Sequence, residues 1–271
     1  MGGPFEFPPP DWARAAFSPD PNPSFVDLIR KIDPSMLPKA DTNVLAPAVP
    51  HGTTILALRF AGGVVMAGDR RATEGFTIAD RKMEKVFAAD DHSAVAIAGA
   101  AGPAIDMVRL LQLELEHYEK LEGDTLSLEG KANRLASMIK ANLPFAMQGI
   151  AVVPIFAGFD IRRGDGRIFR YDVVGGRYED TDYHATGSGG THARGTLKKR
   201  FQPAMARDAA VRAAVEALID AADEDAATGG PDLGRGIFPI VAVVTATGYE
   251  TIPDEELRAL TESLLAERGR A

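Results

Sequence analysis

Cysteine is absent from this chain of 271 residues, so the protein forms no disulfide and has no thiol for catalysis or metal binding. Long apolar runs are also missing, and none approaches the roughly 18 residues expected of a membrane span. The five histidines are scattered without the spacing of metal ligands, which argues against a structural zinc site. The sequence therefore predicts a protein with no metal site and no membrane-spanning segment.

Basic residues are outnumbered by acidic ones: 30 Lys and Arg stand against 38 Asp and Glu, for a formal net charge of −8. Because nucleic-acid phosphates require clustered cations, this balance argues against nucleic acid as a partner. The chain does not open on a basic segment followed by an apolar core, so no secretory signal is expected. We expect a soluble, cytoplasmic protein. Its 45% of hydrophobic residues suffice to bury one large core or two small ones.

The pattern of the chain changes at the junction between Gly52 and Thr53. Residues 1–52 are rich in proline, with Pro8–Pro10 consecutive. Such a segment favours extended, weakly packed conformations, although residues 23–32 match a short amphipathic helix. From Thr53 onward, strand-like and helix-like patterns follow one another closely. The sequence therefore predicts that a folded domain begins abruptly at this junction.

The order of these patterns indicates the fold class. Strands are predicted over 53–60, 64–68, 83–89, 93–99, 149–161, 166–174, 183–187, 236–248 and 249–253, and helices over 103–121, 128–148, 191–201, 208–227 and 254–269. Short turns link neighbouring strands as in antiparallel hairpins, whereas a parallel sheet would alternate single strands and helices. We expect an α+β fold in which two antiparallel sheets pack face to face, each covered by a helix pair: a four-layer αββα sandwich.

Thr53 is the first candidate for chemistry. A glycine before a nucleophile permits backbone conformations that a Cβ would forbid, and Gly52 has that place. Attack of the Thr53 hydroxyl on the Gly52 carbonyl would convert the peptide bond to an ester, and hydrolysis would then leave a free α-amine on Thr53. That amine, with an unperturbed pKa of about 7.7–8.0, is suited to activate its own hydroxyl. The alternative is an ordinary strand threonine.

Asp69 and Lys85 form a second candidate. In a strand, alternate residues share a face, so Lys85 is expected beside Met83 and Phe87. An ammonium on such an apolar face must find an anion or lose its proton, and Asp69 is a candidate partner. The alternative for Asp69 is a turn carboxylate paired with a neighbouring arginine. The alternative for Lys85 is a lysine at an exposed strand edge.

A turn rich in small residues, 97–104, links a predicted strand to a helix. It lacks the Gly-Lys-Ser/Thr of a phosphate loop. Such a turn also serves to aim a backbone N–H at a developing oxyanion. If the strand stays regular, Ile97, Gly99 and Ala101 share one face.

Two later segments have plain structural interpretations. Residues 184–190 fail the nucleophile-elbow pattern, because Thr186 stands where glycine is required. The segment is interpreted as a turn in which Ser188 caps the next helix. Residues 222–232 end a helix with three acids, which oppose the helix dipole and require a compensating cation or N-terminal amine.

Six segments taken together resemble the successive motifs of a proteasome β-subunit of the actinobacterial type: GTTILAL, AGDRRAT, MEKVF, IAGAAG, ATGSGG and DEDAATGG. The resemblance covers residues 53 to about 265, in order and without large insertions. It implies an N-terminal-nucleophile hydrolase with an αββα sandwich, in agreement with the layers predicted above. It further implies a threonine-type endopeptidase and neither a metal nor an organic cofactor.

The resemblance also implies roles for individual residues. Thr53 matches the catalytic threonine after the propeptide glycine Gly52, and Asp69 and Lys85 match the acidic residue and lysine of the family. By the same resemblance, the Gly99 N–H donates to the oxyanion, and the threonine amine is surrounded by Ser188 and Asp225. Substrate pairs as an added strand with Thr73, Gly99 and Ala101. The wall of the specificity pocket is formed by Ala72, Met83, Ile97 and Ala101. Two positions depart from the family pattern: Gly190 replaces a second serine, and Thr228 replaces the serine of the aspartate motif.

At the level of the whole protein, the resemblance implies a propeptide over 1–52, removed by Thr53 itself, and a catalytic domain over 53–271. Identical β-subunits would form seven-membered rings inside a four-ring barrel, with α-subunit rings as partners and an ATP-dependent unfoldase feeding unfolded or tagged proteins. Cleavage is expected after apolar residues. Two alternatives stay open: a non-catalytic ring subunit, against which the intact Thr53, Asp69 and Lys85 argue, and an N-terminal-nucleophile amidohydrolase acting on small amides.

Overall fold

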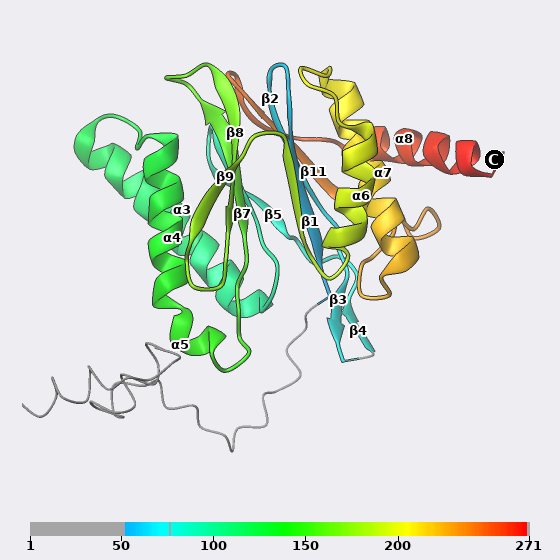
Figure 1. Ribbon diagram of the computed structural model, residues 1–271, viewed down its shortest axis with the longest axis horizontal. Helices are drawn as coiled ribbons and strands as arrows, with labels where there is room; N and C mark the ends of the chain where they lie inside the picture. The colour runs from blue at the N-terminus through cyan, green and yellow to red at the C-terminus, as the bar shows by residue number, and fades with distance from the viewer. Residues whose placement is uncertain (1–51, 76, 270–271) are drawn as a thin grey trace, which may run out of the picture. The chain divides into compact units, whose positions relative to one another are not determined.

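A computed structural model describes residues 52–75 and 77–269 of the chain. The segment predicted as a propeptide, apart from Gly52, and the helix expected over 23–32 lie outside the described residues. Two antiparallel sheets of five strands dominate the rest (Figure 1). The first sheet has the order β10-β1-β2-β11-β12, and the second has the order β5-β6-β7-β8-β9.

The first sheet comprises β1 (Thr54–Phe60), β2 (Gly63–Gly68), β10 (Tyr183–Gly187), β11 (Ile240–Thr245) and β12 (Gly248–Thr251). The second comprises β5 (Val86–Asp90), β6 (Ser93–Ala96), β7 (Ile155–Asp160), β8 (Asp165–Tyr171) and β9 (Arg177–Asp180). A separate hairpin pairs β3 (Ala72–Glu74) with β4 (Thr77–Asp80). The helices are α3 (Ala101–Glu122), α4 (Leu128–Ala141), α5 (Leu143–Ala146), α6 (Gly190–Arg200), α7 (Arg207–Glu224) and α8 (Asp254–Arg268).

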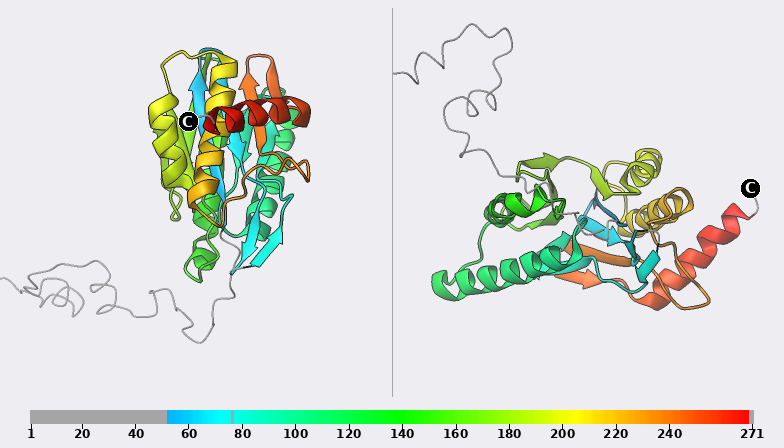
Figure 2. Two further views of the ribbon diagram at one scale, coloured as in Figure 1. Left: turned by 90° about the vertical axis from the view of Figure 1, so that its right-hand side faces the viewer. Right: turned by 90° about the horizontal axis from the view of Figure 1, so that it is seen from below.

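The alternation of side chains along the strands produces the layers. In β1, Ile55 and Ala57 face the core between the two sheets, whereas Leu56 and Leu58 pack with residues of α6 and α7. The outer face of the second sheet packs in the same way against α3 and α4. Figures 1 and 2 show the two helix pairs on opposite sides of the paired sheets, with α8 beside α7. The predicted four-layer αββα sandwich is confirmed.

Several predicted boundaries are wrong, and each has a local reason. The helix expected over 128–148 is divided into α4 and α5, since Pro144 cannot donate the hydrogen bond that would continue α4. The strand expected from residue 149 begins only at Ile155, directly after Pro154. The strand expected over 93–99 ends at Ala96, and Gly99 has a φ of +100°, which a regular strand does not contain.

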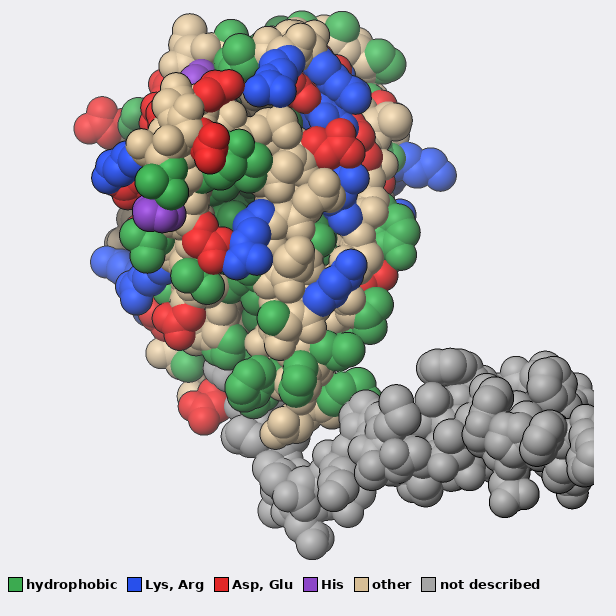
Figure 3. Space-filling view, turned by 90° about the vertical axis from the view of Figure 1, so that its left-hand side faces the viewer, with side chains coloured by type: hydrophobic (Ala, Val, Ile, Leu, Met, Phe, Trp, Pro, Cys, Tyr) green, Lys and Arg blue, Asp and Glu red, His purple; other side chains and the backbone are tan. Residues whose placement is uncertain are grey.

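The surface over α3 and α4 carries apolar side chains among charged ones (Figure 3). Leu113 and Leu121 of α3 are 63% and 70% exposed. None of the helices within the described residues combines the length and apolar character needed to cross a membrane.

Candidate active site

The peptide bond before Thr53 is held in place by its surroundings. The Thr53 hydroxyl donates to the Gly52 carbonyl oxygen over 2.6 Å, and Lys85 Nζ donates to the same oxygen over 3.2 Å. The Gly52 N–H donates to Thr73 Oγ1 over 3.2 Å. A Cβ at Gly52 would lie 2.5 Å from Thr73 Oγ1 and 2.6 Å from the carbonyl oxygen of Ala227, so only glycine fits here. The nucleophile candidate and the carbonyl before it are thus brought together in a buried junction.

Lys85 uses all three of its ammonium hydrogens. Besides the Gly52 carbonyl, Nζ donates to Asp69 Oδ1 over 2.7 Å and to the Arg71 carbonyl over 2.5 Å. The whole side chain is buried, and burial lowers the pKa of Lys85 below its ordinary value, although the Asp69 carboxylate opposes the shift. An ammonium in this position polarises the Gly52 carbonyl.

Asp69 is fixed by four donors. Its Oδ1 accepts from Lys85 and from the Thr54 N–H at 2.8 Å, and its Oδ2 accepts from the N–H groups of Arg71 and Gly229, both at 2.8 Å. Backbone donors from β1 and from the loops after β2 and α7 therefore hold the carboxylate that orients Lys85. Thr54, Arg71 and Gly229 were not among the predicted site residues, and their backbone roles carry no sequence signal.

The predicted ion pair of Asp69 and Lys85 is present, but the reason given for it is wrong. The strand begins only at Val86, so the segment 83–85 does not alternate as a strand does. Phe87 packs against the core formed with α3 and α4, whereas the Lys85 ammonium lies beside Asp69. Lys85 therefore does not share an apolar face with Met83 and Phe87. Its place is determined by long-range hydrogen bonds.

A hydroxyl group and a carboxylate lie in sequence beside the Thr53 nitrogen. The Thr53 N–H donates to Ser188 Oγ over 3.2 Å, and Ser188 Oγ donates to Asp225 Oδ2 over 2.5 Å. Thr228 Oγ1 donates to the same carboxylate oxygen over 2.6 Å. Burial alone would raise the pKa of Asp225, but the hydrogen bonds from Ser188 and Thr228 outweigh it, so the pKa lies below its ordinary value. Asp225 is therefore an ionised acceptor at neutral pH.

This arrangement changes two earlier interpretations. Ser188 does not cap the next helix, because Gly189 occupies the N-cap position of α6 and makes no side-chain bond. Two of the three acids at the end of α7 have partners: Arg268 of α8 pairs with Asp223 over 2.9 Å, and Asp225 accepts hydroxyl hydrogens.

Gly99 lies in an irregular connection between β6 and α3. It forms an isolated bridge with Val152, and a Cβ here would lie 2.2 Å from the Ala151 carbonyl oxygen. Because β6 has ended and Ala101 already begins α3, the expected common strand face of Ile97, Gly99 and Ala101 does not exist. Within the described part of the chain, no acceptor is recorded for the Gly99 N–H, as an oxyanion donor requires.

The other predicted substrate contacts are only partly connected to this centre. Thr73 touches Gly52 through its hydroxyl, and its neighbour Ala72 is buried. The Met83 N–H donates to the Arg70 carbonyl over 3.1 Å, which ties the segment after β4 to the segment before β3. Ile97 is buried as well. The assignment of a pocket wall to Ala72, Met83, Ile97 and Ala101 stays a prediction.

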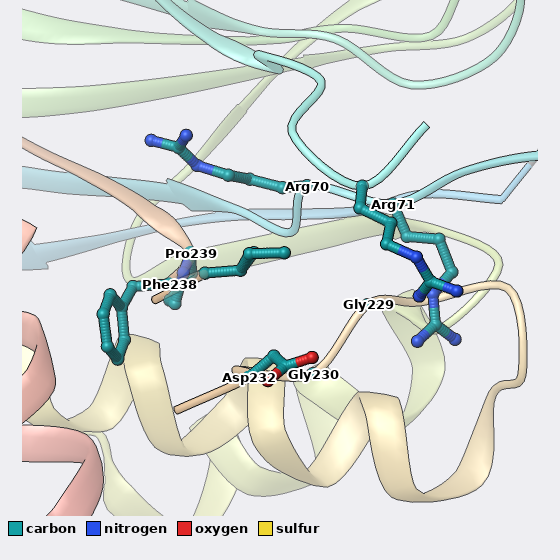
Figure 4. A pocket seen from close by; sticks show the side chains of 9 residues that line it. Arg70, Arg71, Gly229, Gly230, Asp232, Phe238 and Pro239 are labelled. Atoms are coloured by element: carbon teal, nitrogen blue, oxygen red, sulfur yellow. The ribbon is translucent and has the colours of Figure 1, made fainter. Parts of the chain in front are cut away.

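A small cavity of about 40 Å³ lies beside the segment that follows β2, lined in part by Arg70, Arg71 and Gly229 (Figure 4). The Arg70 and Arg71 side chains point to different sides in this view, so they do not converge on one ligand position. Neither Thr53 nor Lys85 lines the cavity. Among the described residues, no group of three or more acids and histidines is arranged to hold a metal ion.

An αββα sandwich built on two antiparallel five-stranded sheets is the fold of the N-terminal-nucleophile hydrolases. A sequence model of the proteasome subunit family matches residues 49–232. The chain is 57% identical to "Proteasome subunit beta" of Acidimicrobium ferrooxidans over 267 residues, which cover 96% of this chain and 98% of that protein. It is 57% identical to the protein of that name from Acidothermus cellulolyticus over 252 residues, covering 90% and 87% of the two chains. For Frankia casuarinae the identity is 53% over 257 residues, 94% of each chain. The chain belongs to the proteasome subunit family.

Proposed function

We propose that this chain is the proteolytic β-subunit of a 20S proteasome core particle and a threonine-type endopeptidase. It first cleaves its own Gly52–Thr53 bond and then uses the exposed Thr53 to hydrolyse peptide bonds of other proteins. The observation that carries the proposal is the contact of 2.6 Å between the Thr53 hydroxyl and the Gly52 carbonyl oxygen, which also accepts from Lys85.

Self-cleavage proceeds through an ester. Thr53 Oγ1 bonds to the Gly52 carbonyl carbon, the carbon–nitrogen bond to Thr53 breaks, and the hydroxyl proton goes to the departing nitrogen. Water then hydrolyses the ester, which leaves a Gly52 carboxylate, a Thr53 hydroxyl and a free α-amine. During the first step negative charge develops on the Gly52 oxygen, where the Lys85 ammonium stabilises it.

In the mature enzyme, the Thr53 α-amine takes the proton from the Thr53 hydroxyl as it attacks a substrate carbonyl. Ser188 lies 3.2 Å from this nitrogen and is itself bonded to Asp225, so an ionised carboxylate supports the protonated amine through one hydroxyl. Asp69 orients Lys85, whose ammonium favours the deprotonated hydroxyl. The Gly99 N–H is suited to receive the oxyanion. The proton passes to the leaving amine, and water releases the acyl group.

Specificity and partners follow from the resemblance and from the names of the relatives. Substrate would pair as an added strand with Thr73, Gly99 and Ala101, and the uncharged side chains of Ala72, Met83, Ile97 and Ala101 favour an apolar residue before the cut. We further propose that identical β-subunits assemble in seven-membered rings between α-subunit rings. An ATP-dependent unfoldase would deliver unfolded or tagged cytoplasmic proteins through those rings.

Intact mass and N-terminal sequencing of assembled particles test the proposal. We expect a chain beginning Thr-Thr-Ile-Leu in the wild type, because Thr53 and Gly52 are already in contact. Thr53→Ala should retain residues 1–52 and lose peptide hydrolysis, since one hydroxyl serves both steps. Thr247→Ala, which removes an exposed hydroxyl far along the chain, should process normally. Wild-type particles that still begin at Met1 or Gly2, or cleavage at Gly52 in pure Thr53→Ala, would contradict the proposed chemistry.

A further inference from the structure

Thr54, the residue after the nucleophile, joins the two halves of the site. Its N–H donates to Asp69 Oδ1 over 2.8 Å, and its carbonyl accepts from the Asp69 N–H over 3.1 Å. Its hydroxyl lies 2.6 Å from Thr228 Oγ1. Thr54 is completely buried, as is Thr228. One residue thus contacts both the carboxylate that orients Lys85 and the hydroxyl that binds Asp225.

A count of hydroxyl hydrogens fixes the donor and acceptor order along the hydrogen bonds that link Thr54, Thr228 and Asp225. Thr228 has one hydroxyl hydrogen, and its bond of 2.6 Å to the Asp225 carboxylate uses it, because an ionised carboxylate only accepts. In the contact between Thr54 and Thr228, Thr54 must therefore be the donor. The order is Thr54 to Thr228 to Asp225. Hydrogen bonds in such a chain polarise one another, and the effect is larger in a buried setting.

The packing around the Thr54 and Thr228 hydroxyls leaves room for their hydrogen bond. A Cβ at Gly189 would lie 2.4 Å from Thr54 Oγ1 and 2.7 Å from Thr228 Oγ1. The glycine before α6 therefore permits the two hydroxyls to meet. Thr228 stands where a serine is usual in the resemblance stated above, and its hydroxyl still reaches Asp225.

We propose that Thr54 is a positioning residue for peptide hydrolysis: its hydroxyl, acting through Thr228, fixes and polarises the Asp225 carboxylate that supports the Thr53 amine. This inference rests on the proposed function. The Thr54 hydroxyl contacts Thr228 rather than the Thr53 hydroxyl or the Gly52 carbonyl, so it acts through its neighbours.

The charges that face Asp225 define the expected pH effect. The titratable groups near Asp225 are the Thr53 amine of the mature enzyme, through Ser188, together with His192 of α6 and the buried Lys85. Loss of the Thr54 donor weakens the hydroxyl chain that stabilises the ionised carboxylate. The carboxylate, less satisfied by Thr228, then accepts more strongly from Ser188, which raises the proton affinity of the Thr53 amine. Because that amine must be neutral to act as the base, the acid limb of the rate profile moves to higher pH.

The experiment compares Thr54→Val, which keeps the shape and removes the hydroxyl, with Thr54→Ser, which keeps the hydroxyl. Fully processed particles are assayed with a fluorogenic peptide across pH. We expect Thr54→Val to lower kcat about two- to tenfold with little change in KM, the range of one neutral hydrogen bond, and to move the acid limb upward. Thr54→Ser should restore both. Thr261→Val is the matched control, because Thr261 is also fully buried but its hydroxyl has no partner among the described residues.

A double-mutant cycle with Thr228→Val completes the test. If Thr54 acts through Thr228, the effects of the two valine substitutions are non-additive. A wild-type rate and pH profile in Thr54→Val would overturn the inference, and so would strictly additive effects in the double mutant. Either result leaves the proposed function intact as long as Thr53→Ala is inactive. An active Thr53→Ala would instead overturn the proposed function itself. If Thr54→Val particles fail to assemble, the kcat, KM and pH profile of Thr54→Ala are compared with those of Thr54→Ser instead.

Discussion

At the scale of single residues, the site depends on one cation that three acceptors hold. Lys85 bonds to the Asp69 carboxylate and to the carbonyls of Gly52 and Arg71, so its ammonium has no hydrogen left for a fourth partner. Only the bond to Gly52 touches a group that would react in the proposed self-cleavage. The other two position the nitrogen, which is why removal of Lys85 should harm chemistry more than folding.

Lys85→Ala should reduce peptide hydrolysis by about 10²–10⁴-fold, the usual contribution of a group that positions or transfers protons. Folding should survive, because Asp69 keeps three backbone N–H donors. Lys131→Ala is the matched control: Lys131 is also buried and pairs with Asp90, at 2.5 Å, away from Thr53. Turnover is measured on assembled particles, with thermal unfolding alongside. If Lys85→Ala and Lys131→Ala lose activity equally, Lys85 is only structural.

The candidate residues themselves were predictable, but their geometry was not. Thr53, Asp69, Lys85, Ser188 and Asp225 were named from sequence motifs, and the structure brings all five into one hydrogen-bonded group. The strand alternation used to orient Lys85 failed because the chain is irregular before Val86. Hydrogen bonds between residues far apart in sequence set that irregular segment, and no local pattern reports them.

At the scale of elements, the layers could be predicted because strand alternation and hairpin turns are local features. The hairpin of β3 and β4 was missed, as was the edge strand β9. All three strands are short, and β4 and β9 contain no buried residue, so they carry no apolar alternation. The missed hairpin matters to the site, since Thr73 in β3 receives the hydrogen bond of the Gly52 N–H.

Gly52→Ala tests this contact between the hairpin and the junction. A methyl group at residue 52 would meet Thr73 Oγ1 at 2.5 Å and the Ala227 carbonyl oxygen at 2.6 Å, so β3 or the junction must move. We expect cleavage before Thr53 to slow by at least tenfold, since the hydroxyl loses its alignment with the carbonyl. Gly195→Ala in α6 serves as the control, because nothing lies within 4 Å of its added Cβ. Accumulation of processed chain is followed by mass spectrometry over time. Equal processing rates in the two variants would show that the close fit at Gly52 is dispensable.

At the scale of the whole molecule, assembly separates the proposed endopeptidase from a hydrolase of small amides. The latter has no need of a large particle, whereas a ring-enclosed peptidase requires one. The activity should therefore elute with particles of high native mass and be absent from the Thr53→Ala protein prepared in the same way. The peptides that these particles accept then report on the specificity pocket.

A fluorogenic peptide panel that varies only the residue before the cut tests the pocket on fully processed particles. The proposed wall of Ala72, Met83, Ile97 and Ala101 contains no charge, so burial of a Leu, Tyr or Phe side chain should be favoured by about 1.5–3 kcal/mol. That corresponds to roughly ten- to a hundredfold in kcat/KM over a charged residue, because an Arg or Glu would lose its hydration without gaining a partner. Lys85 does not alter this expectation, since Asp69, Arg71 and Gly52 already occupy its three hydrogens. Thr53→Ala particles correct for contaminating peptidases. Faster cleavage after Arg or Glu than after Leu, Tyr or Phe would overturn the pocket assignment and leave the nucleophile assignment intact.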